Sequence, residues 1–297
     1  MSTNDIWTFK YAPTSFDEII LSPDIKPILK KVIKEKPNIM LVGNAGVGKG
    51  TFTDIFLNET GLDYIKLNCS DETSVQDIRD KVKTFATSLG MTGMKIVVLN
   101  ESDYISINGQ AMLRDLMESV HKITRFIFQC NYKNKIIPEI HSRCQVIEIS
   151  SPPIKDIGLH VLKILKAEGI KIKNKTIIGD TIKKFYPDIR RIINTLQLNT
   201  VNKTLGDFDL ESSNETYDKI FEYMKNGDLD NIRKTLRSES VNYPELYQHL
   251  FDMAGDFKSP GDAIIEIGEY LFRSSLVAIQ EINFITMVVS MMKRGII

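Results

Sequence analysis

Short apolar runs and helical patterns alternate along the first half of the chain. The five apolar runs are IMLV (39–42), YIKLNC (64–69), KIVVLN (95–100), RFIFQCN (125–131) and QVIEI (145–149). Between the first four runs, segments such as TSVQDIRDKVKTFATSL and NGQAMLRDLMESV space their apolar residues as an amphipathic helix does. Strands that alternate with helices favour a parallel sheet covered on both faces. We therefore expect an α/β domain with a parallel five-stranded sheet over residues 1–150.

The pattern changes after residue 150. The polar stretch SSPPIKD contains two prolines, which indicates a linker. The next segment has helical spacing up to Gly169, a suitable C-cap, and two short helices follow, divided near Pro187. After a second polar stretch, NKTLGDFDLESSN, helical patterns continue to Ile297. The sequence thus predicts a small helical domain over residues 151–205 and a larger all-α domain over residues 206–297.

Composition adds little to this picture. The chain has 297 residues, of which 42% are apolar and 26% charged, as in an ordinary soluble globular protein. Lys+Arg and Asp+Glu number 38 each, so net charge favours neither nucleic acid nor a membrane as a partner, although a local basic face is compatible with it. The three cysteines, Cys69, Cys130 and Cys144, lack metal-ligand spacing. With neither a signal peptide nor an apolar run of about 20 residues, the expected location is the cytoplasm.

The stretch GNAGVGKGT, residues 43–51, has the form of a phosphate-binding loop. It follows the run at Ile39–Val42 and opens a helical pattern, which is the context that this motif requires. Its glycines let backbone N–H groups approach phosphate oxygens, and the helix N-terminus favours an anion. Lys49 would reach the β- and γ-phosphates. The sequence therefore predicts a nucleotide-binding site here.

Two positions depart from the usual P-loop ATPase pattern. Gly50 stands where a Ser or Thr would bind Mg²⁺, and the first hydroxyl comes one residue later, at Thr51. The strand at 95–100 ends in NESD, which puts Asn100 at the metal position and Glu101 at the position that orients the attacking water. An amide oxygen is a weaker ligand for Mg²⁺ than a carboxylate. We expect ATP to bind with a weak dependence on Mg²⁺ and to be hydrolysed slowly.

Further motifs occur in a fixed order. They are FKYAPTSFDEII, NCSDETSVQDIRDKVKTFA, NGQAMLRDLMES, QCN, HSRC and YPDIRRIINTLQ. Together with the P-loop, this series resembles an AAA+ clamp-loader ATPase subunit of the replication factor C small-subunit type. The pattern is most similar to the large subunit of T-even-like phage loaders. The resemblance covers nearly the whole chain and implies an AAA+ domain, a helical lid domain and a helical collar that packs subunits into an open ring.

The resemblance also implies roles for individual residues. The implied ATP contacts are Lys10, Tyr11, Ile20, Gly43, Gly46, Val47, Gly48, Lys49, Gly50, Thr51 and Arg190, with Ala12 replacing an arginine usual in the family. The implied catalytic residues are Lys49, Glu101, Asn131 at the sensor-1 position and Arg143, which would project into a neighbouring subunit's ATP site. Asn100 is the implied weak Mg²⁺ ligand. The resemblance thus implies ATP and Mg²⁺ as cofactors.

The implied partners are copies of the chain, a small loader subunit, a sliding clamp and primer–template DNA, in a bacterial host cytoplasm if the gene is carried by a phage. Arg79 and Lys83 lie four residues apart and share one helix face, which by resemblance contacts DNA. A solvated basic edge is the alternative for this pair. The apolar end, INFITMVVSMMKRGII, fits either a buried core helix or a subunit interface.

Two other functions compete with a hydrolysing loader subunit. The first is a nucleotide kinase that acts on small molecules, because adenylate kinases also carry GKGT. Their loop lies near the N-terminus, however, and they lack an SRC segment and a collar. The second is a loader subunit that binds nucleotide without hydrolysing it, which the changes at Gly50 and Asn100 favour.

Overall fold

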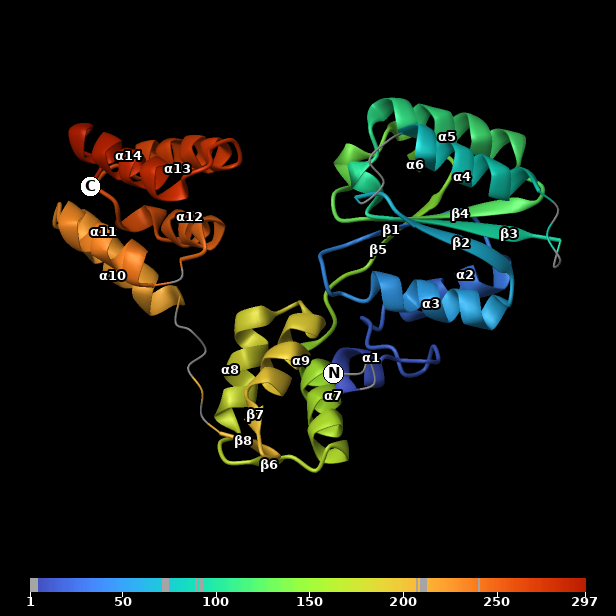
Figure 1. Ribbon diagram of the computed structural model, residues 1–297, viewed down its shortest axis with the longest axis horizontal. Coiled ribbons are helices and arrows are strands. Elements are labelled where there is room, and N and C mark those ends of the chain that lie inside the picture. The colour runs from blue at the N-terminus through green and yellow to red at the C-terminus, as the bar shows by residue number, and fades with distance from the viewer. Residues whose placement is uncertain are drawn as a thin grey trace. The chain divides into compact units, whose positions relative to one another are not determined.

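The structure is a computed structural model, and it describes residues 5–70, 75–88, 90, 93–206, 208, 213–239 and 241–297. The chain forms two compact units, Met1–Phe208 and Asp209–Ile297 (Figure 1). The first unit contains the P-loop and every candidate site residue. The second is entirely helical in its described part.

A parallel five-stranded sheet forms the centre of the first unit. Its order is β2–β3–β4–β1–β5, and each neighbouring pair is parallel. The strands are β1 (Ile39–Val42), β2 (Asp63–Asn68), β3 (Lys95–Asn100), β4 (Thr124–Cys130) and β5 (Gln145–Glu148). This confirms the predicted sheet, because each strand falls on one of the five apolar runs.

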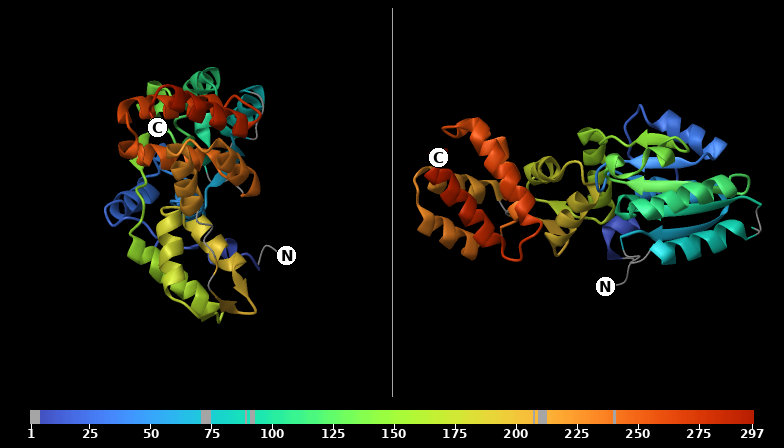
Figure 2. Two further views of the ribbon diagram at one scale, coloured as in Figure 1. Left: turned by 90° about the vertical axis from the view of Figure 1, so that its left-hand side faces the viewer. Right: turned by 90° about the horizontal axis from the view of Figure 1, so that it is seen from above.

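Helices cover both faces of the sheet (Figure 1, Figure 2). On one side lie α2 (Lys26–Glu35) and α3 (Lys49–Thr60), and on the other α4 (Val75–Thr87), α5 (Ile107–Ser119) and the short α6 (Pro138–His141). Successive side chains of the inner strands therefore enter two different cores. Met40 joins the α4–α5 core, whereas its neighbours Ile39 and Leu41 join the α2–α3 core. Burial on both faces explains why these strands are continuous apolar runs.

The residues after the sheet form a helical lid within the same unit. Its helices are α7 (Ile154–Ala167), α8 (Thr176–Phe185) and α9 (Ile189–Leu198). A small sheet of two-residue strands, β6 (Lys171–Ile172), β7 (Thr200–Val201) and β8 (Thr204–Leu205), adjoins them. This small sheet was not predicted from the sequence, because a strand of two residues carries no periodicity. In the β7–β8 loop Asn202 and Lys203 both have positive φ, as a tight two-residue hairpin requires.

The second unit is a bundle of five helices in its described part. They are α10 (Ser213–Lys225), α11 (Leu229–Ser238), α12 (Tyr243–Asp252), α13 (Pro260–Ser274) and α14 (Gln280–Lys293). The apolar end of the chain is a core helix here, because Phe284, Met287, Val288 and Met291 of α14 are fully buried in the unit's own core. Among the described residues, no helix has the length and apolar character needed to cross a membrane.

Candidate nucleotide-binding site

A cleft of about 300 Å³ opens at the carboxyl edge of the parallel sheet. This edge is where open α/β sheets bind ligands, because the loops that follow the strands converge there. Four parts of the first unit contribute to the wall: the N-terminal segment, the P-loop, the ends of β3 and β4, and the lid. The lining residues are Thr8, Tyr11, Ala12, Pro13, Ile19, Ile20, Ala45, Gly46, Gly48, Lys49, Gly50, Thr51, Asn100, Glu101, Gln129, Cys130, Asn131, His160, Ile189, Arg190 and Ile193.

The P-loop needs its glycines for close backbone approach. A Cβ on Gly43 would lie 2.7 Å from the carbonyl oxygen of Ile149, and one on Gly46 would lie 2.1 Å from Asp188 Oδ1 in the lid. Gly46 also has a φ of 75° and Gly48 one of 102°, a region that other residues rarely adopt. Gly48 is the N-cap of α3 and provides no side-chain cap, so the helix presents backbone N–H groups to an anion.

Lys49 lies at the phosphate end of the cleft. Its Nζ donates to the carbonyl oxygens of Gly43 (2.6 Å) and Asn44 (2.8 Å), and to Asn131 Oδ1 (2.8 Å) at the end of β4. Burial lowers the pKa of the Lys49 ammonium from its ordinary value, because the charged form loses water. Burial also raises the pKa of the neighbouring Cys130 thiol to about 11, so this neighbour stays neutral. Lys49 forms no direct ion pair with any residue that the structure describes, so phosphate oxygens would supply a direct charge partner.

The end of β3 brings Asn100 and Glu101 to the same wall. Asn100 Oδ1 is buried and has no hydrogen-bond partner among the described residues. Buried polar atoms are normally paired, so this oxygen fits a ligand atom or cation entering the cleft. Glu101 is exposed and has a φ of 52°. Such a backbone is uncommon outside glycine and turns the carboxylate-bearing residue out of the strand direction.

Mg²⁺ would have few protein ligands in this site. Asn100 and Thr51 line the cleft with an amide and a hydroxyl oxygen, and Glu101 adds a carboxylate. These groups fit a Mg²⁺ that keeps most of its ligands as phosphates and water, as this ion commonly does. A bound Mg²⁺ would neutralise charge on the phosphates. Gly50 contributes no side chain, and the nearest atom to a Cβ built there is an Arg190 side-chain nitrogen, Nη2, at 3.7 Å.

Apolar residues line the opposite end of the cleft. Tyr11, Ile19 and Ile20 come from the N-terminal segment, and Ile193 comes from the lid. His160 of α7 also lies on this wall, and burial lowers the pKa of its imidazole, so it is held neutral. A largely apolar wall with a few polar groups is typical of a site for a planar base.

Three of the expected ATP contacts do not line the cleft. Val47 is 1% exposed and packs in the α2–α3 core. Gly43 lies outside the lining, although its carbonyl oxygen accepts a hydrogen bond from Lys49. Lys10 is bound to Glu168 of the lid, with Nζ 2.6 Å from Oε1. The remaining expected contacts, Tyr11, Ile20, Gly46, Gly48, Lys49, Gly50, Thr51 and Arg190, all lie on the wall.

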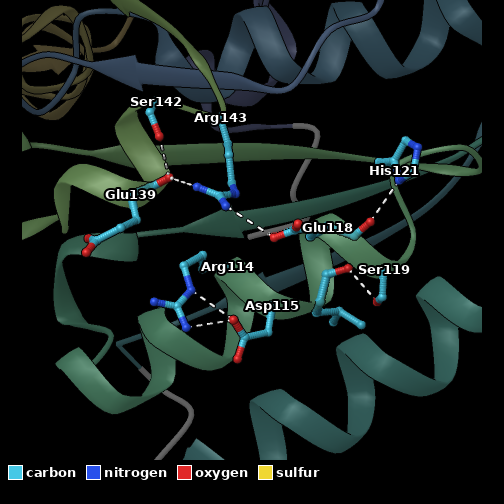
Figure 3. A network of polar contacts seen from close by, with 9 residues as sticks. Arg114, Asp115, Glu118, Ser119, His121, Glu139, Ser142 and Arg143 are labelled. Atoms are coloured by element: carbon cyan, nitrogen blue, oxygen red, sulfur yellow. Dashed lines mark hydrogen bonds and ion pairs between the residues drawn. The ribbon is translucent and has the colours of Figure 1, made fainter.

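Arg143 lies away from this chain's cleft, on the surface beside α5 and α6 (Figure 3). One guanidinium nitrogen donates to the carbonyl oxygen of Glu139 at 3.0 Å, and another lies 3.2 Å from Glu118 Oε2. Nearby, Arg114 is paired with Asp115 on the same helix α5. These contacts hold the Arg143 side chain on an outer face, where a second molecule could meet it.

Arg79 and Lys83 are both exposed on α4, as expected for residues that share one face of a helix. They lie outside the cleft lining.

Two functional candidates were missed by sequence reasoning. Asp103 is buried and its Oδ2 accepts from the backbone N–H groups of Asn131 and Tyr132, each at 3.3 Å, which fixes the loop after β4. Its signal was its place in the NESD segment. Glu168, the lid partner of Lys10 and Tyr11, had no local signal because those partners lie about 157 residues away.

One cleft contains a P-loop lysine, an acidic residue after β3, a sensor-like asparagine after β4 and a lid arginine. This arrangement defines the class as a P-loop ATPase of the AAA+ type. The family model for the ATPase family associated with various cellular activities matches residues 39–151. The model for the sliding-clamp-loader large subunit, AAA+ ATPase lid domain, matches residues 154–207.

Curated relatives identify the family. The chain is 32% identical over 270 residues to the replication factor C small subunit of Methanococcus vannielii, covering 87% of this chain and 82% of that protein. It is 30% identical over 296 residues to the replication factor C small subunit of Methanocella arvoryzae, covering 92% of each. The chain therefore belongs to the replication factor C small-subunit family, and it is an AAA+ ATPase of the clamp-loader type.

Solved structures agree on the fold. The chain is similar to the RuvB Holliday junction branch migration motor of Thermotoga maritima, with a TM-score of 0.52 and 15% sequence identity over 81% of this chain and 92% of that one. At this identity the likeness concerns the fold alone.

Proposed function

We propose that this chain is the ATP-binding subunit of a sliding-clamp loader, which opens the clamp and places it on primer–template DNA during replication. ATP hydrolysis then releases the loader. The observation that carries the proposal is the single cleft that joins Lys49, Glu101, Asn131 and the lid residue Arg190, in a chain of the replication factor C small-subunit family. The clamp-loader lid model over residues 154–207 also favours this function over a nucleotide kinase.

The cleft supports a division of roles around ATP. Lys49 and Arg190 bring two positive charges to its phosphate end, where they would stabilise the charge that develops on the γ-phosphate. Glu101 would orient the attacking water, and Asn131 would contact the same phosphate after exchanging its bond to Lys49. Tyr11, Ile20 and the apolar lid residues would hold the base.

Hydrolysis should be slow because the metal is weakly held. Gly50 supplies no hydroxyl, and Asn100 supplies an amide oxygen rather than a carboxylate. Mg²⁺ would then be held mainly by phosphates and water. Glu101 is retained, which favours residual turnover over none.

The proposed assembly contains copies of this chain, a small subunit, the clamp and DNA. Arg143 would act in trans on a neighbour's ATP, in accord with its position outside this chain's own cleft. Arg79 and Lys83 would contact the DNA backbone. In this proposal residues 1–150 bind nucleotide, residues 151–205 form the lid, and residues 206–297 form the oligomerisation collar.

A phage origin belongs to the same proposal. The lid model is that of a sliding-clamp-loader large subunit, while the curated relatives named above are archaeal replication factor C chains. If the gene is carried by a phage, the protein acts in the cytoplasm of the bacterial host.

The second candidate is a loader subunit that binds nucleotide without hydrolysing it. The joint change at Gly50 and Asn100 favours it, because both positions are usual protein contacts to Mg²⁺. A steady-state ATPase assay with the partner subunit, clamp and primed DNA separates the two. We expect slow turnover that Glu101→Gln abolishes. Equal rates for wild type and Glu101→Gln would assign the cleft to the non-hydrolysing subunit.

A further inference from the structure

The N-terminal segment is attached to the lid before it reaches the α/β core. Trp7, in α1 (Trp7–Lys10), is 6% exposed, and its backbone N–H donates to Gln197 Oε1 at 2.9 Å. The Gln197 amide in turn donates to the carbonyl oxygen of Asp5 at 2.7 Å. The lid residues that share a small apolar pocket with Trp7 are Val161, Ile164, Leu165, Ile193 and Leu196.

Further along, the same segment joins the core beside the sheet. Phe16, Ile19 and Leu21 are buried in the α2–α3 core. Residues 8–13 therefore cross from the lid to the α/β domain, and this crossing contains Thr8, Tyr11, Ala12 and Pro13 of the cleft wall. The position of this wall depends on what holds the crossing in place.

Glu168 of the lid holds residues 8–13 in place. It follows α7 as its C-cap, and its Oε1 accepts from Lys10 Nζ at 2.6 Å and from the Tyr11 hydroxyl at 2.7 Å. The bond from Lys10, followed by that from Tyr11, lowers the pKa of the Glu168 carboxyl, so it is a carboxylate at neutral pH. Hydrogen bonds to an ionised acceptor are stronger than those between neutral groups.

The two bonds do not contribute equally. Lys10 has 46% of its side chain exposed, and exposed ion pairs add little because water screens them. The Tyr11 bond is half-buried and fixes a ring that lines the cleft. Glu168 thus acts on the site through Tyr11.

We propose that Glu168 is a positioning residue for the base-binding wall of the cleft. It joins residues 8–13 and α7 into one wall, in which Tyr11 comes from the N-terminal segment and His160 from the lid. A lid movement then moves the base contacts as well as Arg190. The inference rests on the proposed ATP site and adds the residue that holds its base side.

The test separates base contacts from phosphate contacts in the full-length chain. Calorimetry would compare binding of ATP and of inorganic tripolyphosphate by wild type, Glu168→Gln and Tyr11→Phe. Tripolyphosphate can bind the P-loop through its phosphates but has no base to contact the base-binding wall. Asp180→Asn is the matched control, because it removes an exposed carboxylate from α8 of the same lid.

We expect Glu168→Gln to weaken ATP binding roughly tenfold, the effect of losing about one charged hydrogen bond, and to leave tripolyphosphate binding unchanged. Tyr11→Phe should act in the same direction, and the double variant should lose less than the sum, because both remove one interaction. Asp180→Asn should match wild type for both ligands.

If Glu168→Gln binds both ligands as tightly as wild type does, the contact of Glu168 with Lys10 and Tyr11 is only a surface interaction, and the inference is overturned. An equal loss for both ligands would also overturn it, since the residue would then support the fold and not the base wall. If wild type binds neither ligand, the proposed function itself fails.

Discussion

Lys49 is the residue on which phosphate binding most depends. It is held by two loop carbonyls and by Asn131, and burial has already removed part of its water. Lys49→Ala removes a charged hydrogen bond worth about 1–3 kcal/mol, so ATP affinity should fall roughly ten- to hundredfold. Calorimetry measures this, with Lys34→Ala on the exposed side of α2 as control. Unchanged affinity would mean that the loop is only a turn.

Gly50 and Asn100 determine how the site treats Mg²⁺. A Cβ built at position 50 would lie 3.7 Å from its nearest neighbour, an Arg190 side-chain nitrogen, which is ordinary van der Waals contact. Gly50→Thr combined with Asn100→Asp should raise turnover in the assembled loader and make ATP binding more dependent on Mg²⁺, because two hard oxygen ligands return. Gly179→Thr, at an open helical position, controls for loss of a glycine. No gain in turnover would show that metal ligation does not limit the rate.

At this scale the sequence predicted which residues line the cleft better than it predicted their hydrogen-bond partners. Lys49, Glu101 and Asn131 were assigned from motifs, and they meet in one cleft because their strands end at one edge of the sheet. The partners of Lys10 and Asp103 were not predictable. A hydrogen bond between residues far apart in the chain leaves no periodic signal, and it exists only once the fold brings them together.

Helix α4 carries the basic pair proposed to contact DNA. Replacing Arg79 and Lys83 by alanine should weaken DNA binding by the loader to a similar extent for every sequence. It should also lower the slope of log affinity against log salt by roughly 2, since about two phosphate contacts disappear. Fluorescence anisotropy over a salt series measures both. Lys30 and Lys34 have the same spacing on exposed positions of α2 and provide the control pair. An unchanged slope would assign Arg79 and Lys83 to a solvated edge.

Element prediction succeeded where burial imposes a long pattern. The inner strands β1, β3 and β4 of the large sheet are buried along almost their whole length and so are mostly apolar runs. The strands β6, β7 and β8 have two residues each and give no pattern. The short helix α1 was not predicted from the sequence for a different reason. Its four residues fold against the lid, and the stabilising contacts come from residues after position 160.

The second unit is the proposed site of assembly. Its core is closed within the unit, yet it exposes large apolar residues, among them Ile265 (64%), Phe272 (70%), Leu276 (74%) and Ile282 (61%). Deleting Ser213–Ile297 should leave a monomer that still binds ATP, because the whole cleft lies in the first unit. Light scattering with the partner subunit and ATP measures this. Phe272→Ser with Leu276→Ser should weaken assembly without truncation. If the full-length chain stays monomeric with the partner subunit and ATP, the prediction that residues 206–297 form an oligomerisation collar is wrong.

The attachment of Trp7 to the lid also bears on how the chain folds during synthesis. Trp7 is synthesised well before Leu196, which lies in the same small apolar pocket near the end of the first unit. The N-terminal segment therefore docks on the lid only after almost the whole unit has been synthesised. Contacts of such long sequence separation form late in folding. Trp7 is also the single tryptophan of the chain. Its fluorescence consequently reports, without any added label, when the lid and the start of the chain have come together.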